Sequence, residues 1–81
     1  MRLAYTKKFN KQYDEAIGQI KDAFKKQASL LLQNSQHPSL DFKLYNKSEG
    51  VWQARVNSKW RFYVTIDGDI YTLLAITKHP K

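Results

Sequence analysis

The 81-residue chain is long enough for one compact domain, so we expect residues 1–81 to form a single unit. It has no cysteine, which excludes disulfide bonds and thiolate metal sites and fits a cytoplasmic location. Its 14 Lys and Arg residues against 7 acidic residues give a net charge of +7, which favours a polyanionic partner such as nucleic acid or an acidic protein. The sequence shows neither a signal-peptide pattern nor a membrane-spanning stretch, so we expect no membrane association.

The chain is expected to open with a short strand over residues 2–6, where two apolar side chains fall on one side. Thr6 is a good N-cap for a helix that follows. Phe9 and Tyr13 are four residues apart, which places them on one face of that short helix.

A second helix is expected to begin at Asp14 or Glu15, because an acidic side chain suits the positive N-terminal end of the helix dipole. Apolar residues then recur at steps of three or four, as on one face of a helix: Ile17, Ile20, Phe24, Ala28 and Leu31. The polar residues 34–39 contain a proline that cannot continue the helix, so the helix is expected to end there.

Residues 40–45 are expected to form a strand with Leu40, Phe42 and Leu44 on one side and Lys43 on the other. A loop over residues 46–50 follows.

Residues 51–66 predict a β-hairpin, because aromatic and β-branched residues alternate with polar ones on both sides of the polar break at 57–59. With a three-residue loop one face of the hairpin is wholly apolar: Val56 faces Trp60, Ala54 faces Phe62 and Trp52 faces Val64. The other face then carries Gln53, Arg55, Arg61, Tyr63 and Thr65. A two-residue loop would shift the pairing by one residue and mix the two faces, so the three-residue loop is preferred.

The next turn, at residues 67–69, allows two interpretations before the last strand at 70–77. A two-residue Asp-Gly loop places Tyr71, Leu73 and Ala75 on the apolar face. A three-residue loop that ends at Gly68 instead places Ile70, Leu74 and Ile76 there, and sends Thr77 and His79 to the face of Arg55. We prefer the second, because its three aliphatic residues make the better core.

These elements predict an α+β fold of order β-α-α-β-β-β. Two N-terminal helices pack on one face of a small, mainly antiparallel sheet, because helices and sheet each have a single apolar side to bury.

Several segments in this order resemble the RelE/ParE superfamily of toxins from type II toxin–antitoxin modules. They are HPSL at 37–40, W-x-A-R-V-N at 52–57, W-R-F-Y at 60–63, D-G-D at 67–69 and I-T-K-H at 76–79. The resemblance implies the β-α-α-β-β-β fold and neutralisation by a cognate antitoxin. For the RelE branch it implies a ribosome-dependent endoribonuclease that cuts mRNA, and for the ParE branch a non-enzymatic inhibitor of DNA gyrase.

RNA cleavage by the substrate 2′-hydroxyl needs no metal or cofactor, but it needs two proton transfers and fixed positive charge at the reacting phosphate. The resemblance assigns the charge to Arg55, whose forked donors suit two phosphate oxygens; the alternative is a surface ion pair with Asp67 or Asp69. It assigns a proton transfer to His79, since imidazole ordinarily titrates near neutral pH; the alternative is a merely solvated histidine.

The same resemblance assigns Lys43 and Lys47 to the RNA backbone, with solvated lysines as the alternative. Arg61 lies beside Arg55 in the expected register, which suggests an anion between them. Tyr63 is expected either to stack on a base or to pack. His37 is expected either to serve catalysis or, as we favour, to cap a helix end or pack there. We therefore favour an mRNA endoribonuclease with ribosome, mRNA and antitoxin as partners. The alternatives are a gyrase inhibitor and a non-toxic basic RNA-binding domain.

Overall fold

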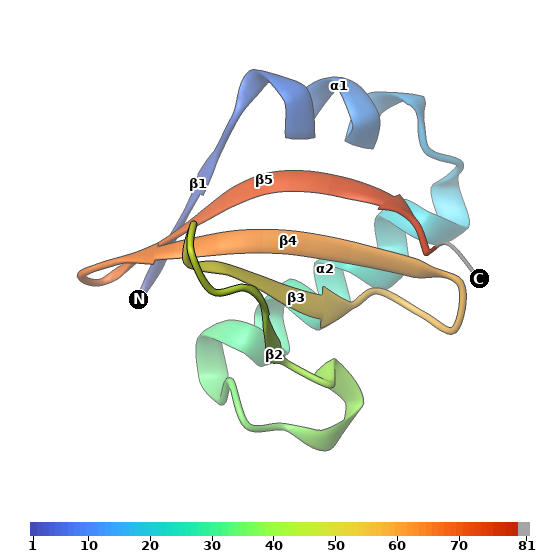
Figure 1. The fold of residues 1–81 in the computed structure, drawn as a ribbon. Helices are drawn as coiled ribbons and strands as arrows, with labels where there is room; N and C mark the ends of the chain where they lie inside the picture. The colour runs from blue at the N-terminus through green and yellow to red at the C-terminus, as the bar shows by residue number, and fades with distance from the viewer. Residues whose placement is uncertain (80–81) are drawn as a thin grey trace.

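Two helices cover one face of a five-stranded sheet (Figure 1). The structure, a computed structural model, describes residues 1–79. Its elements are β1 (Arg2–Tyr5), α1 (Lys7–Glu15), α2 (Gly18–Gln33), the short 3₁₀ helix η1 (Pro38–Leu40), β2 (Lys43–Asn46), β3 (Val51–Arg55), β4 (Trp60–Asp67) and β5 (Ile70–Lys78). The strand order is β1-β5-β4-β3-β2, with β1 parallel to β5 and the other pairs antiparallel. The expected arrangement of one strand, two helices and then antiparallel strands is confirmed.

The first helix begins as the sequence predicts, but the second does not. The Thr6 hydroxyl accepts a hydrogen bond from the Phe9 N–H at 3.1 Å and so caps α1. Asp14 and Glu15 lie in the last turn of α1, and α2 begins only at Gly18, without a side-chain cap. The prediction that Asp14 or Glu15 opens the second helix is therefore wrong, because the first helix extends through both residues before the chain turns.

The strand expected over residues 40–45 begins three residues later, at Lys43. Residues 38–40 instead form η1, and Asp41 follows it in the left-handed region with φ of 45°. This turn sends Leu40 into the core, where it is fully buried, and leaves Leu44 largely exposed at the edge of the sheet. A proline suits the first turn of a helix, which explains why the chain coils here before it extends.

The central hairpin of β3 and β4 has the register that the sequence predicts. Ala54 lies opposite Phe62 and Trp52 opposite Val64. The Val56 N–H donates to the Trp60 carbonyl at 3.0 Å. The apolar side of this hairpin faces the helices, so the three-residue loop is confirmed.

The β4–β5 hairpin combines parts of both interpretations. Asp67 lies opposite Ile70, so the loop has two residues, and one extra residue of β5, Leu74, interrupts the pairing further along. Such a bulge reverses the face on which the following side chains lie. Tyr71 and Leu73, which precede Leu74, therefore point into the core, and after the bulge the buried residue is Ile76. The prediction of Ile70 and Leu74 in the core is wrong, whereas that of Ile76 is confirmed.

An aromatic cluster joins the two helices to the sheet. The Phe24 ring lies 5.1 Å from that of Phe9 on α1 and 5.2 Å from that of Phe62 on β4, measured between centroids. Aromatic pairs add about 0.5–1.5 kcal/mol each beyond the area that they bury. The cluster therefore fixes the helices on one side of the sheet and leaves the other side uncovered by them.

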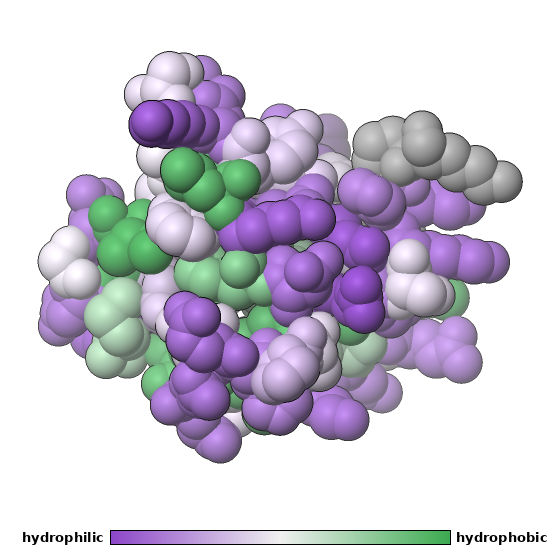
Figure 2. Space-filling model, turned by 60° about the horizontal axis from the view of Figure 1, so that its bottom comes forward, coloured by the Kyte–Doolittle hydropathy of each residue, from purple (hydrophilic) through white to green (hydrophobic). Residues whose placement is uncertain are grey.

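Hydrophilic side chains cover most of the surface in Figure 2, and apolar surface appears in separate patches between them. The exposed large apolar residues come from different elements: Met1, Tyr5, Ile17, Leu32, Leu44, Tyr45 and Ile66. No helix within residues 1–79 is both long and apolar enough to cross a membrane.

Candidate functional site

The face of the sheet that points away from the helices, called the front face below, collects the polar side chains of the central hairpin. Arg55 on β3 lies opposite Arg61 on β4, and Thr77 on β5 lies opposite Arg61. Because the neighbouring pair of residues 56 and 60 is hydrogen-bonded, Arg55 and Arg61 form a narrow pair with Cα atoms about 4.5 Å apart. Two permanent positive charges thus sit side by side on this face.

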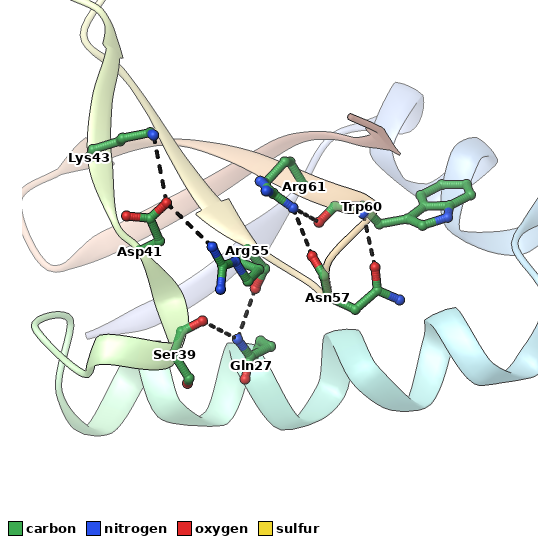
Figure 3. Close-up of polar contacts among 8 residues, drawn as sticks. All are labelled: Gln27, Ser39, Asp41, Lys43, Arg55, Asn57, Trp60 and Arg61. Atoms are coloured by element: carbon green, nitrogen blue, oxygen red, sulfur yellow. Dashed lines mark hydrogen bonds and ion pairs between the residues drawn. The ribbon is translucent and has the colours of Figure 1, made fainter. Parts of the chain in front are cut away.

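Arg55 is the accessible member of the pair, since 43% of its side chain is exposed. Its Nη2 atom lies 3.8 Å from Oδ2 of Asp41 (Figure 3). Its Nε atom is buried and has no hydrogen-bond partner within residues 1–79. An external anion can therefore reach the guanidinium through its exposed part and not through Nε.

Arg61 is buried and serves the hairpin loop. Its Nη1 atom donates to the carbonyl of Asn57 at 2.7 Å and to that of Trp60 at 3.0 Å (Figure 3). The Asn57 side chain in turn accepts from the Lys59 and Trp60 N–H groups at 2.9 Å each. These bonds order the loop and hold the second positive charge behind Arg55.

Asp41 is a site residue that no sequence pattern singles out. Its carboxylate lies between Arg55 and Lys43, 3.6 Å from Nζ of Lys43. The alternative partners considered for Arg55, Asp67 and Asp69, lie at the β4–β5 turn at the other end of β4, and the carboxylate near Arg55 is that of Asp41 instead. The left-handed backbone of Asp41, created by η1, brings its carboxylate to the front face.

Gln27 on α2 fixes the backbone beneath the site. Its Nε2 atom donates to the carbonyl of Ser39 at 3.0 Å and to that of Arg55 at 2.9 Å (Figure 3). The side chain is buried, so it ties α2, η1 and β3 together inside the protein. The sequence does not reveal this role, because it shows only that a polar residue, Gln27, interrupts the apolar face of its helix.

Of the other predicted site residues, some lie near Arg55 and one does not. Gln53 lies between Lys43 on β2 and Tyr63 on β4, in the row of the sheet next to the two arginines. Its Nε2 atom donates to the Tyr63 hydroxyl at 3.1 Å. Lys47 is exposed in the β2–β3 turn, beyond the opposite end of β3 from Arg55. The structure therefore brings Lys43 to Arg55 and leaves Lys47 apart.

The two histidines differ in position. His79 is exposed, and its N–H donates to the Lys59 carbonyl at 2.6 Å, two residue pairs beyond the Arg61–Thr77 pair in the β4–β5 ladder. Nothing in the contacts described for residues 1–79 joins its ring to Arg55. His37 caps η1, since its Nδ1 atom accepts from the Ser39 N–H at 3.2 Å. The capping role favoured for His37 is thus present.

A hollow of about 600 Å³, called the front-face hollow below, adjoins the arginine pair. Its walls come from Tyr45, Val51 and Tyr63 on one side and from Leu74, Ala75 and Thr77 on the other, with Thr6 and Lys8 at the start of α1. Its lining is mostly apolar, whereas the neighbouring row is cationic. In residues 1–79 no group of three His, Cys, Asp or Glu side chains is placed to hold a metal ion.

Comparison with solved structures finds this fold in several toxins. The YoeB/ParE toxin from Agrobacterium tumefaciens gives a TM-score of 0.79 at 14% identity, and the match covers 99% of this chain and 100% of that chain. YafQ from E. coli strain BL21(DE3) gives 0.79 at 16% identity, over 95% of this chain and 91% of that one. The RelB–RelE antitoxin–toxin complex from Methanococcus jannaschii gives 0.73 at 19% identity, over 93% of this chain and 88% of the matched one.

The likeness to these proteins extends over nearly the whole chain, and at such low identities it shows the fold alone. Comparison of the sequence with protein-family models and with curated proteins finds no match. The architecture expected from the sequence resemblance is therefore confirmed by structure rather than by sequence similarity.

Proposed function

We propose that this protein, which has the fold of the YoeB-, YafQ- and RelE-like toxins, is the toxin of a type II toxin–antitoxin module. Within that class we propose a ribosome-dependent endoribonuclease that cuts mRNA and so inhibits translation in the cytoplasm. The observation that carries the proposal is the narrow pair of Arg55 and Arg61 on the front face, where 43% of the Arg55 side chain is exposed. A chain of net charge +7 also suits a nucleic-acid substrate.

In the proposed reaction the 2′-hydroxyl of a nucleotide attacks its own 3′ phosphate, and the bond to the next 5′ oxygen breaks. Negative charge builds up on the phosphate oxygens as the phosphorane forms. Arg55 supplies fixed positive charge at that place, and its forked donors match two oxygens. Arg61, held by two carbonyl groups, adds a second charge that needs no reorganisation during the reaction.

The reaction also moves two protons: one leaves the 2′-hydroxyl and one reaches the departing 5′ oxygen. We assign one of these transfers to His79, which lies two residue pairs along the ladder from the Arg61–Thr77 pair. Lys43 is assigned to the RNA backbone, because it lies on the same face as Arg55 and is largely exposed. We assign His37 a structural role, which its capping bond to the Ser39 N–H supports.

A cognate antitoxin is the proposed protein partner. The RelE structure with this fold was solved as a complex with its antitoxin RelB, which supports such a partner. An acidic or amphipathic antitoxin segment suits a basic protein with a cationic front face.

The test is induction of the protein without its antitoxin, followed by purification for a cleavage assay with ribosomes. Growth arrest with cleaved mRNA is expected for the wild type. Arg55→Ala should lower the cleavage rate about 10²- to 10³-fold, which is the usual loss when a charge-stabilising donor is removed. Arg55→Lys, which keeps the charge without the fork, should retain an intermediate rate.

Circular dichroism and thermal unfolding of both variants show whether the fold is intact. A folded Arg55→Ala protein that cuts mRNA at the wild-type rate would remove the proposed mechanism. Growth arrest with altered DNA supercoiling and intact mRNA would identify a gyrase inhibitor instead, and no growth arrest would point to a non-toxic RNA-binding domain.

A further inference from the structure

We propose that the front-face hollow binds one nucleobase of the RNA, with Tyr45 as the surface on which the base stacks. This inference rests on the proposed RNA substrate and adds a subsite to it. Single-stranded RNA is bound by stacking of its bases on aromatic side chains next to cationic groups that hold the backbone. The hollow and the arginine row provide these two features side by side.

The aromatic wall of the hollow is already in place. The rings of Tyr45 and Tyr63 lie 4.9 Å apart between centroids at an interplanar angle of 61°, so they form a corner. The Tyr63 hydroxyl is held by Nε2 of Gln53, a side chain that is itself buried. Tyr45 is 61% exposed, which leaves its ring surface free for a ligand. A fixed ring beside an open one costs little ordering when a base binds.

Two β-bulges build this hollow, one on each side. The pairing of β2 with β3 shifts between Leu44 and Asn46, so Tyr45 is the unpaired residue there. The pairing of β4 with β5 shifts at Tyr63, and Leu74 is the extra residue. Both bulged residues line the hollow. Bulges re-aim side chains and are frequent next to active sites, so two that converge on one hollow indicate a functional surface.

The spacing between hollow and arginines suits one nucleotide. Tyr63 and Arg61 are on the same face of β4, two residues apart, which is about 6.8 Å along a strand. A base that stacks at the tyrosines therefore places its own sugar and phosphate toward the arginine pair. Lys8, at the rim of the hollow near the start of α1, supplies positive charge on the other side. The mostly apolar hollow thus lies between Lys8 on one side and the arginine pair on the other. This arrangement fits a base in the hollow and a phosphate at each cationic side.

The experiment measures binding of a short single-stranded RNA and of the same RNA with one base removed, by fluorescence anisotropy. The wild type should lose affinity about fivefold to a hundredfold when the base at the cleavage position is missing. Tyr45→Ala should bind the intact RNA that much more weakly and should no longer distinguish the two RNAs. Tyr45→Phe, which keeps the ring, should behave like the wild type.

Tyr5→Ala is the matched control, because Tyr5 is comparably exposed at 51% but lies on the helix-covered side beside Phe9. It should leave both affinities unchanged. Equal binding of the two RNAs by the wild type would overturn the inference without the use of any variant. So would a Tyr45→Ala protein that binds RNA normally and loses affinity only for the antitoxin.

The assay reads binding and not cleavage, so it separates this inference from the proposed function. Base-dependent binding without cleavage would keep the subsite and reject the nuclease. Cleavage with no base-dependent binding would keep the nuclease and reject the subsite.

Discussion

At the scale of single residues, the two arginines of the narrow pair have the same side chain but different surroundings. Arg61 is buried and commits a nitrogen to two carbonyls of the hairpin loop. Arg55 is nearly half exposed, and among the described residues its guanidinium has one ion-pair partner, the carboxylate of Asp41, at a distance longer than a hydrogen bond. In the proposed RNA complex, a phosphate and the Asp41 carboxylate would therefore compete for Arg55.

We predict that Asp41→Asn strengthens binding of single-stranded RNA about 1.5- to 5-fold, because exposed ion pairs of this kind contribute about 0.2–1 kcal/mol. Asparagine tolerates the left-handed backbone at this position, so the turn should survive. Asp22→Asn makes the same charge change on the exposed side of α2 and is the control. Equal affinity gains in both variants would mean that Asp41 acts only through the net charge.

At the scale of elements, the site depends on contacts between segments rather than on the hairpin alone. Gln27 joins α2 to the backbones of η1 and β3, so it positions both Asp41 and Arg55. Toward the β1 edge of the sheet, Oε1 of Gln12 on α1 accepts from the Ile76 N–H at 2.9 Å, beyond the point where β1 ends its pairing with β5. Each glutamine thus forms a hydrogen bond with a backbone group that has no partner on a neighbouring strand within residues 1–79.

We predict that Gln27→Leu lowers the free energy of unfolding by about 1–3 kcal/mol, because two carbonyl groups lose their partner inside the protein. The melting temperature should fall by about 4–8 °C for each kcal/mol in a domain of this size. Gln19→Leu, on the exposed part of the same helix, should change stability by less than about 0.5 kcal/mol. Similar unfolding midpoints in urea for both variants would refute the structural role of Gln27.

At the scale of the whole molecule, the helices cover one face of the sheet and leave a cationic surface on the other. Several exposed lysines lie on the helices rather than on the front face: Lys7, Lys11, Lys25 and Lys26. The net charge of +7 alone therefore does not say which face binds a polyanion. Only charges that touch phosphate release counterions when RNA binds.

We predict that Lys43→Gln reduces the slope of log affinity against log salt by about 0.7, which is the value expected for one lost phosphate contact on a single strand. Lys26→Gln, an equal change of charge on α2, should shift the affinity slightly and leave the slope unchanged. The measurement is RNA binding over a series of salt concentrations. Equal slopes for the two variants would place the RNA away from the front face.

Local patterns in the sequence are sufficient for much of this fold. The alternation around the 57–59 loop fixes the face of every side chain in the central hairpin, because only one register keeps Ala54, Phe62 and Val64 together in the core. The same alternation is enough to place Arg55 and Arg61 side by side. The capping threonine and the helical spacing of the apolar residues in α2 also act within a few residues, so the sequence alone reveals them.

Tertiary structure alone decided the features that depend on segments far apart in the chain. The bulges at Tyr45 and Leu74 arise from how neighbouring strands pair, so no periodicity predicts them or the hollow between them. The left-handed turn at Asp41 and the two bonds of Gln27 likewise need η1, α2 and β3 to meet. The sequence by itself thus determined which side chains share a face, since that is a local property of strands. Which carboxylate opposes Arg55, and what surface lies beside it, was decided by packing.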